Sequence, residues 1–531
     1  MSFGWRDKEP RVFDGKISLS AGEVVRIEGW RFDRNDKVTG PNQWRMSTRL
    51  ALMRKWRPDE LARFEKLGRK PPKPPLIQNG VIAYVRAPTT ARVRVRTKAG
   101  EFAFPIAELQ YGRKLVRMNG NVRIERVPID EQITQPPTHD DYVSMTIAPD
   151  RSIWVAWIAF DKERERDAVF VRRCYKGIWE APRCLSERSW DHYGTAIGIA
   201  GDGRVWVVWA GQVNGNVDLY ARAVERDGKL SRIVRLTNAP QPDLFHRMVA
   251  DARGRLWLVW QGFRNNQSDI FLKCYDPSVG RWGDELRISE SDADDWMPAV
   301  AVDATSRVHI AWDTYERGNY DIRMRTFDGK RLSIIYEITT SPAFEAYVDI
   351  AVDANNRVWL VWNQAGVNWG KDTGFLLRPP ISSTPPPGER LYAQRWIRMA
   401  CIVGGKLQTP KPALVDALPR GIARRLNDHP KIRFDKDGRL WVFYRRRTVK
   451  RQGTGGGSHR AIWYLYGAYW DGNRWRTDVW FPHSAGRKDT RYDVVAHPDG
   501  GFVIAWASDE RPWRNPVPRN TNVHIARMEA V

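Results

Sequence analysis

The chain of 531 residues lacks any long hydrophobic run. No apolar segment reaches the length that spans a membrane, and residues 1–7 contain no apolar stretch of the kind found in a secretory leader. The sequence therefore predicts a soluble protein without a membrane span. We expect it in the cytoplasm, or as a secreted protein expressed without its leader.

Cysteine is scarce, with four residues in the chain: Cys174, Cys184, Cys274 and Cys401. Cys174 and Cys274 occupy the same position of the repeat described below, so we expect free, buried thiols. No Cys and His residues have the spacing of a zinc site, and neither a metal nor another cofactor is expected. No recognised nucleic-acid-binding motif is present, which makes nucleic acid a less favoured partner.

One phrase, by contrast, recurs seven times along the chain. Its clearest copies are residues 251–260 (DARGRLWLVW) and 435–444 (DKDGRLWVFY). The copies are 52, 51, 52, 50, 82 and 62 residues apart, so two intervals carry insertions. These spacings join the turn residues of the copies, which are Arg151, Gly203, Gly254, Ser306, Asn356, Gly438 and Gly500.

Each copy reads as two apolar strands around a tight turn, followed by two further strands. Four antiparallel strands in about 50 residues are typical of a propeller blade, so seven copies predict a seven-bladed β-propeller over residues 121–531. An extended array is the alternative, but no terminal copy resembles a polar cap. The last copy lacks a fourth strand, and we expect a strand near residues 122–127 to close the ring. Most of the 26 Trp residues then belong to the core.

Residues 1–120 lack the repeat and read mostly as strands, at 16–19, 23–27, 81–85, 92–96 and 101–104. We expect a basic, β-sandwich-like N-terminal domain here. The predicted fold class of the whole chain is therefore all-β.

Positive charge is unevenly distributed. Residues 1–130 hold 28 Lys and Arg against 14 Asp and Glu, which places +14 of the net charge of +24 in the first quarter of the chain. A second basic segment runs from Arg424 to Arg451. This balance indicates an acidic polysaccharide or other polyanion as partner, or else a basic face that serves solubility. One row of alternating cations is the candidate polyanion-binding strand: Arg92, Arg94, Arg96 and Lys98.

Function in a propeller usually lies at one mouth of the central channel. The loops expected there collect aromatic, His, acidic and Arg residues, which suit sugars because aromatic faces stack on pyranose rings and Arg binds carboxylates. The alternative is that these residues are repeat turns that pack on the next blade. The candidate substrate-binding residues are Trp296, Asp313, Tyr347, Trp369, Lys371, His429, Arg491 and Arg511.

If the protein is an enzyme, β-elimination on a uronic-acid polysaccharide is the favoured chemistry, because it needs a base, an acid and a cation that neutralises the carboxylate. His192 or His246 is the candidate base, and Tyr193 or Tyr492 is the candidate acid. The candidate carboxylate ligand is Arg247, Arg491 or Arg511. A glycoside hydrolase would instead pair two carboxylates. A noncatalytic binding or assembly module with a protein or polyanionic partner stays open, and in that case the insertion at residues 378–420 would block the mouth.

Two resemblances add to this interpretation. The turn at residues 202–206 (DGRVW) resembles the Asp-box of sialidase-type propellers but lacks its Ser and Thr, which implies a related blade and not sialidase activity. Residues 139–142, 312–315, 318–321, 368–372 and 484–489 resemble phrases of uncharacterised bacterial seven-bladed propeller proteins, in which a phosphoesterase-like domain of unknown function often follows the propeller. That resemblance implies the fold and leaves the substrate open.

Overall fold

The computed structural model describes the chain in two units, residues 2–129 and 130–530. Described are residues 17–18, 25–29, 38–39, 81–85, 92–97, 100–105, 115–117, 122–126, 129–134, 137–163, 165–186, 191–367, 369, 394–420, 422–447, 462–481, 484–486, 490–509 and 520–528. In this part of the chain, no helix is long and apolar enough to cross a membrane.

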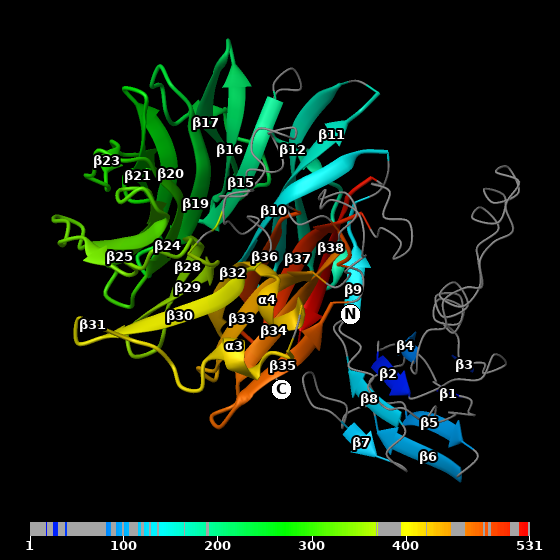
Figure 1. The fold of residues 1–531 in the computed structure, drawn as a ribbon. Helices are drawn as coiled ribbons and strands as arrows, with labels where there is room; N and C mark the ends of the chain where they lie inside the picture. Colours follow the sequence, from blue (N-terminus) through cyan, green and yellow to red (C-terminus); the bar gives the residue numbers. More distant parts are fainter. Residues whose placement is uncertain are drawn as a thin grey trace, which may run out of the picture. The chain divides into compact units, whose positions relative to one another are not determined.

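The second unit is a seven-bladed β-propeller, with one antiparallel sheet per blade (Figure 1). The first blade contains β10 (His139–Ile147), β11 (Ile153–Asp161), β12 (Arg166–Tyr175), β13 (Ile178–Trp179) and β14 (Arg183–Cys184). The second contains β15 (Asp191–Ile199), β16 (Val205–Val213), β17 (Asn216–Val224) and β18 (Val234–Arg235). The third contains β19 (Asp243–Ala250), β20 (Leu256–Arg264), β21 (Gln267–Asp276), β22 (Arg281–Trp282) and β23 (Leu286–Arg287).

The remaining blades follow the same order. The fourth contains β24 (Asp295–Val302), β25 (Val308–Thr314), β26 (Asp321–Phe327) and β27 (Tyr336–Glu337). The fifth contains β28 (Glu345–Val352), β29 (Val358–Gln364), β30 (Trp396–Val403) and β31 (Lys406–Gln408). The sixth contains β32 (Asn427–Phe434), β33 (Leu440–Arg447), β34 (Trp463–Trp470) and β35 (Trp475–Trp480), and two short helices precede it, α3 (Leu414–Ala417) and α4 (Ile422–Arg425). The seventh contains β36 (Tyr492–Ala496), β37 (Phe502–Ser508) and β38 (Asn522–Met528), and it is completed by β9 (Ile129–Gln132).

The ring is closed by β9 and not by residues 122–127, so the expected closing strand was placed a few residues too early. Val122–Arg126 forms β8, which pairs with β2 (Val25–Gly29) and β7 (Leu115–Arg117). Both segments are short strands, and the sequence does not show which of them pairs with the last blade. Next to β9, Ile133 N–H donates to the carbonyl of Val523 at 2.8 Å, and this bond fixes the closure.

The first unit contains two four-stranded sheets. One has the order β4-β2-β8-β7, where β4 is Val81–Val85. The other has the order β3-β1-β5-β6, with β3 at Val38–Thr39, β1 at Ile17–Ser18, β5 at Arg92–Thr97 and β6 at Gly100–Pro105. These strands overlap all five strands expected from the sequence, while a sandwich-like packing of the two sheets stays a prediction.

Hydrogen bonds explain why the repeated phrase has its form. In the third blade, Asp251 Oδ1 accepts the backbone N–H groups of Arg253 and Arg255, each at 2.9 Å. Its Oδ2 accepts Arg255 Nε at 2.7 Å and Trp257 Nε1 at 3.0 Å. One carboxylate therefore closes the turn and orients both the Arg and the Trp that follow. All seven turn residues named above have φ between 58° and 108°, the left-handed region that such turns require.

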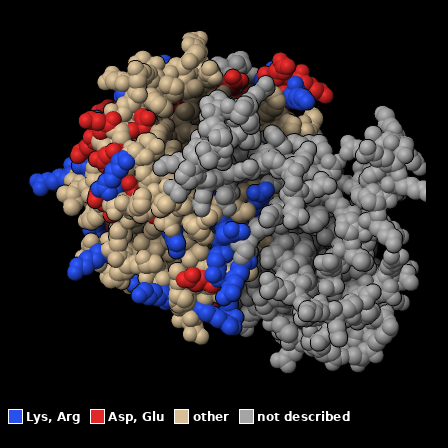
Figure 2. Space-filling view, viewed as in Figure 1, with Lys and Arg blue, Asp and Glu red and all other residues tan. Residues whose placement is uncertain are grey.

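Adjacent blades are joined by cations on four of the third strands. Each donates to a backbone carbonyl of the preceding blade, at 2.6–3.1 Å, and the pairs are Arg172 with Ile133, Arg222 with Leu185, Lys273 with Leu236, and Arg325 with Ile288. Part of the basic composition is therefore structural. Side chains of both signs reach the described surface of the propeller (Figure 2).

The Trp residues of the repeated phrase belong to the hydrophobic core, as expected. Trp209, Trp260, Trp312 and Trp506 of the second strands are fully buried between blades. The four cysteines form no disulfide: Cys174 and Cys401 are buried, whereas Cys184 and Cys274 are half-buried.

Candidate functional site

The first strands of the blades surround a central channel, because each contacts the next and the last contacts the first. In the first six blades this strand contains a bulge near its start. The bulge residues in the left-handed region are Tyr142, Gly194, Phe245, Met297, Tyr347 and His429, with φ between 49° and 64°. The bulges therefore place six equivalent backbone turns around one mouth of the channel.

Polar side chains from the preceding blade hold three of these bulges. Asp313 Oδ2 accepts Tyr347 N–H at 2.9 Å, Asn363 Oδ1 accepts His429 N–H at 3.0 Å, and Gln261 Oε1 accepts Met297 N–H at 3.4 Å. Burial raises the pKa of Asp313 to about 8, against the effect of the two backbone N–H groups that it accepts. The candidate substrate-binding residue Asp313 thus holds the bulge of the next blade, as a structural residue of the repeat would. It does not line the cavity described below.

Beyond the bulges, one equivalent residue of each blade lines the channel, because alternate residues of a strand share a face. Three of these positions hold small residues and four hold charged ones. In blade order they are Ser144, Ala196, Arg247, Ala299, Asp349, Lys431 and Asp493. The charges therefore gather in the third, fifth, sixth and seventh blades.

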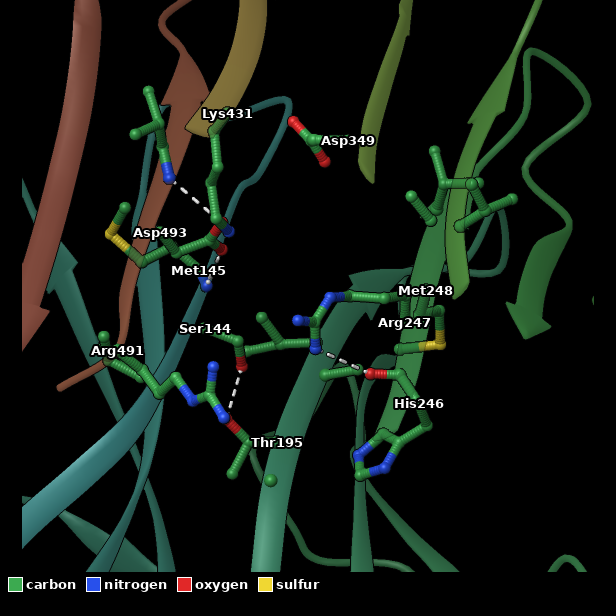
Figure 3. Close-up of a pocket in the computed structure, with 18 of the residues that line it drawn as sticks. Ser144, Met145, Thr195, His246, Arg247, Met248, Asp349, Lys431, Arg491 and Asp493 are labelled. Atoms are coloured by element: carbon green, nitrogen blue, oxygen red, sulfur yellow. Dashed lines mark hydrogen bonds and ion pairs between the residues drawn. The ribbon is translucent and has the colours of Figure 1, made fainter. Parts of the chain in front are cut away.

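These residues line a cavity of about 680 Å³ (Figure 3). Lys431 Nζ pairs with Asp493 Oδ1 at 2.9 Å, and Arg433 Nη1 pairs with Asp349 Oδ2 at 2.7 Å. Burial alone would raise the pKa of Asp493, but Lys431 and Arg433 outweigh it and hold the pKa below its usual value. Asp493 is thus held ionised by the cations beside it, and Asp349 is ion-paired with Arg433.

Two further guanidinium groups enter the same cavity without such neutralisation. Arg247 and Arg491 point toward one another from opposite sides in Figure 3. Among the described residues, no carboxylate lies within ion-pair distance of either group. Arg247 Nη1 donates to the carbonyl of His246 at 3.1 Å. Loss of hydration inside the channel and the charge of Arg491 lower the Arg247 pKa, against the attraction of Asp493 and Asp349. In the part of the chain that the structure describes, four cations and two carboxylates line the cavity, an excess of two positive charges.

The candidate catalytic residues are only partly brought together. His246, Arg247, Tyr193 and Tyr492 line the cavity, but His192 does not, and its ring instead meets the edge of Trp209 at 6.2 Å between centroids. His246 is 1% exposed, its Nε2 lies 3.0 Å from the carbonyl oxygen of Val208, and burial lowers its pKa to about 4.

The two tyrosines differ in their exposure. Tyr492 is buried, and its hydroxyl donates to the carbonyls of His429 and Phe443. Tyr193 is 38% exposed, and burial followed by the charges of Asp191 and Asp167 raises its pKa. Tyr193 is therefore the candidate proton donor that a ligand in the cavity can reach.

Among the candidate substrate-binding residues, His429 and Arg491 line the cavity. Trp296 and Trp369 join an aromatic cluster around Tyr320, with ring centroids 5.1 and 5.3 Å from it, and Tyr347 packs on His429 at 4.7 Å. Lys371, Arg511 and Lys98 lie outside the described residues. Arg92, Arg94 and Arg96 belong to β5, and their role in polyanion binding stays a prediction.

Sequence reasoning missed Asp349, Lys431, Arg433 and Asp493 as cavity residues. A signal was present, because a charge two residues beyond the bulge residue interrupts an otherwise apolar first strand, as in residues 345–352 (EAYVDIAV), where Asp349 follows Tyr347. The described part of the insertion, residues 394–420, lines no part of the cavity. Its helix α3 instead contacts β30 and β35.

Comparison with known proteins gives no family. No family model matches the sequence, and no curated protein matches it. Among solved structures, a polysaccharide lyase named Uly1 is similar over 79% of this chain and 95% of the lyase, with 9% identity and a TM-score of 0.47. An α-L-arabinanase of Penicillium chrysogenum is similar over 76% of this chain and 97% of its own, with 12% identity and a TM-score of 0.39.

A protein of unknown function from Dyadobacter fermentans is similar over 64% of this chain and 97% of its own, with 12% identity and a TM-score of 0.40. Similarity at this level carries no argument about activity or substrate. Membership of the uncharacterised bacterial propeller proteins stays a prediction.

Proposed function

We propose that the protein is a carbohydrate-binding propeller that holds the carboxylate of an acidic saccharide between Arg247 and Arg491. The observation that carries this proposal is the pair of guanidinium groups that face one cavity without a carboxylate partner among the described residues. Since Lys431 and Arg433 are already neutralised, an entering anion meets these two groups. A bound carboxylate would relieve the mutual repulsion that contributes to the lowered pKa of Arg247.

The rest of the lining suits a sugar. The cavity volume lies within the range of small-molecule sites, roughly 300–1,000 Å³. Its wall mixes aliphatic side chains such as Ile197 and Val249 with polar groups such as Thr490 and the ion-paired carboxylates. A saccharide offers both an apolar C–H face and several hydroxyl groups, which such a wall can accommodate.

β-Elimination at this site is the second candidate function. It is favoured by Tyr193, which is exposed at the same cavity and stays protonated at neutral pH because its pKa is raised. A protonated tyrosine can donate to the leaving oxygen while Arg247 and Arg491 neutralise the carboxylate, and the proton beside the carboxylate would pass to His246, the candidate base that lines the cavity. Noncatalytic binding remains the first candidate because His246 and Tyr492 are engaged by backbone carbonyls.

Calorimetric titration with oligogalacturonate tests both candidates when the absorbance of unsaturated uronate is followed in the same mixtures. We expect binding to the native protein and to Arg281→Met, a control on the outer strand β22, and loss of binding in Arg247→Met. Thermal melting verifies that each variant is folded. An absence of binding to the native protein overturns the proposal. Rising absorbance that Tyr193→Phe abolishes makes the protein a lyase, whereas binding without absorbance makes it a noncatalytic module.

A further inference from the structure

The mouth of the cavity is bordered by large side chains that the bulges present. We call these residues the collar: Tyr142, Tyr193, Phe245, Met297, Tyr347 and His429. In the second blade Gly194 occupies the left-handed position and Tyr193 precedes it. All collar residues except Tyr347 line the cavity, and Tyr347 packs on His429. The collar thus adds an aromatic layer above the charged one.

The collar is held in an unusual backbone conformation. Tyr142, Phe245, Met297, Tyr347 and His429 have φ between 49° and 61°, a region that bulky L-residues seldom adopt. Such conformations persist where the surrounding structure fixes them, and they concentrate at ligand-binding positions. The cross-blade hydrogen bonds of Asp313 and Asn363 provide that fixation here. Three collar positions, Met297, Tyr347 and His429, are therefore held by a side chain of the preceding blade.

Two collar side chains remain open to solvent although they are aromatic. Phe245 is 42% exposed and Tyr193 is 38% exposed, and both lie at the mouth of the cavity. Packing against another blade therefore does not account for them. An apolar aromatic surface that lines the same cavity as the guanidinium groups of Arg247 and Arg491 matches a ligand with a charged end followed by an apolar face.

We infer that the collar binds the second sugar of an acidic oligosaccharide whose terminal carboxylate lies between Arg247 and Arg491. This inference rests on the proposed function and extends it, because it makes the ligand a chain that the protein recognises by its charged end. The C–H face of the second pyranose ring packs on Phe245 and Tyr193. A monosaccharide reaches only the guanidinium groups, so the second sugar raises the affinity.

Parallel titrations of glucuronate and of glucuronosyl-xylose, a disaccharide that carries its carboxylate on the terminal sugar alone, test the collar. The native protein is expected to bind the disaccharide roughly tenfold more tightly than the monosaccharide. Phe245→Ala removes this difference and leaves the monosaccharide affinity unchanged within about twofold, whereas Phe245→Tyr keeps the aromatic ring and the difference. Tyr175→Ala is the matched control, because Tyr175 is an equally exposed aromatic residue at the end of β12, away from the cavity.

The outcomes separate the inference from the function on which it rests. Equal affinity of the native protein for both sugars, or equal weakening of both by Phe245→Ala, overturns the collar inference and leaves the carboxylate site in place. Binding of neither sugar to the native protein overturns both.

Discussion

The first hairpin of a blade has a turn at one end and a channel-lining position at the other. The residues at the turn are similar between blades, whereas the channel-lining residues differ. At the turn, an Asp recurs with the same hydrogen bonds in the third, fifth and sixth blades, through Asp251, Asp353 and Asp435. At the channel, equivalent positions differ from blade to blade, from Ala196 and Ala299 to Arg247 and Lys431. The repeat therefore builds the ring, and departures from the repeat build the site.

Removing a shared core residue should have the largest effect. Trp260 is fully buried, and its Nε1 donates to Asp243 at 2.9 Å. We expect Trp260→Ala to lower the free energy of unfolding by about 3–5 kcal/mol, because it leaves a cavity between blades. The variant also removes one hydrogen bond from Asp243, which keeps its ion pair with Arg264 at 3.0 Å. Urea denaturation measures this loss. Ile178→Ala, at a side chain that is 74% exposed, should change little, and an equal loss there would contradict the assignment of Trp260 to the core.

Breaking one turn should have a smaller effect. Asp435 accepts the N–H of Arg439 at 2.9 Å, Arg439 Nε at 2.7 Å and Trp441 Nε1 at 2.9 Å. Asp435→Ala is expected to cost roughly 1–3 kcal/mol of unfolding free energy, because buried donors lose their partner. Asp437→Ala removes only an exposed carboxylate from the same Arg439 and should cost below about 1 kcal/mol. Comparable losses in the two variants would refute the role given to Asp435.

The pH dependence of the unfolding free energy tests whether the buried carboxylates at the starts of the first strands have a structural role. Burial followed by the charge of Asp269 raises the pKa of Asp295 to about 6, against hydrogen bonds from Thr314, Ser289 and Trp312. Because the folded-state pKa exceeds the unfolded one, its contribution to stability is complete below the unfolded pKa and is lost as the pH rises through about 6.

We expect Asp295→Asn to abolish that part of the pH dependence, on the order of 1–3 kcal/mol between pH 4 and 7. Differences in unfolding free energy between native protein and variant, measured at several pH values, give the slope directly. A slope of the opposite sign would show that the carboxylate is stabilised in the folded state.

A negative charge introduced at Ala196, one of the small channel-lining residues, tests whether the charged residues of the channel determine binding. Ala196→Asp should partly neutralise the excess positive charge of the cavity and weaken binding of an acidic saccharide by roughly 3–10-fold. Ala196→Asn is the control of equal size and should retain most of the affinity. Titration that shows equal weakening by both variants would indicate a steric effect and not an electrostatic one.

The repeat made the fold accessible from the sequence. Seven copies of one repeated phrase identified the blades, and each predicted turn residue has the expected positive φ. The closing strand was predicted at the wrong segment because residues 122–127 and β9 are both short segments that precede the first blade in the sequence. The cavity was only half predicted, since Arg247 and Arg491 stood in the expected loops whereas Asp349 and Lys431 follow bulges that shift the register.

The closure through β9 also governs how the molecule can be made. Ile133 hydrogen-bonds to Val523, so the ring can close only after almost the whole propeller has been synthesised. Until then the growing chain carries open sheet edges, which are templates for pairing with other chains. A nascent propeller of this design is therefore most vulnerable to self-association during synthesis, and an interrupted chain keeps that vulnerability permanently.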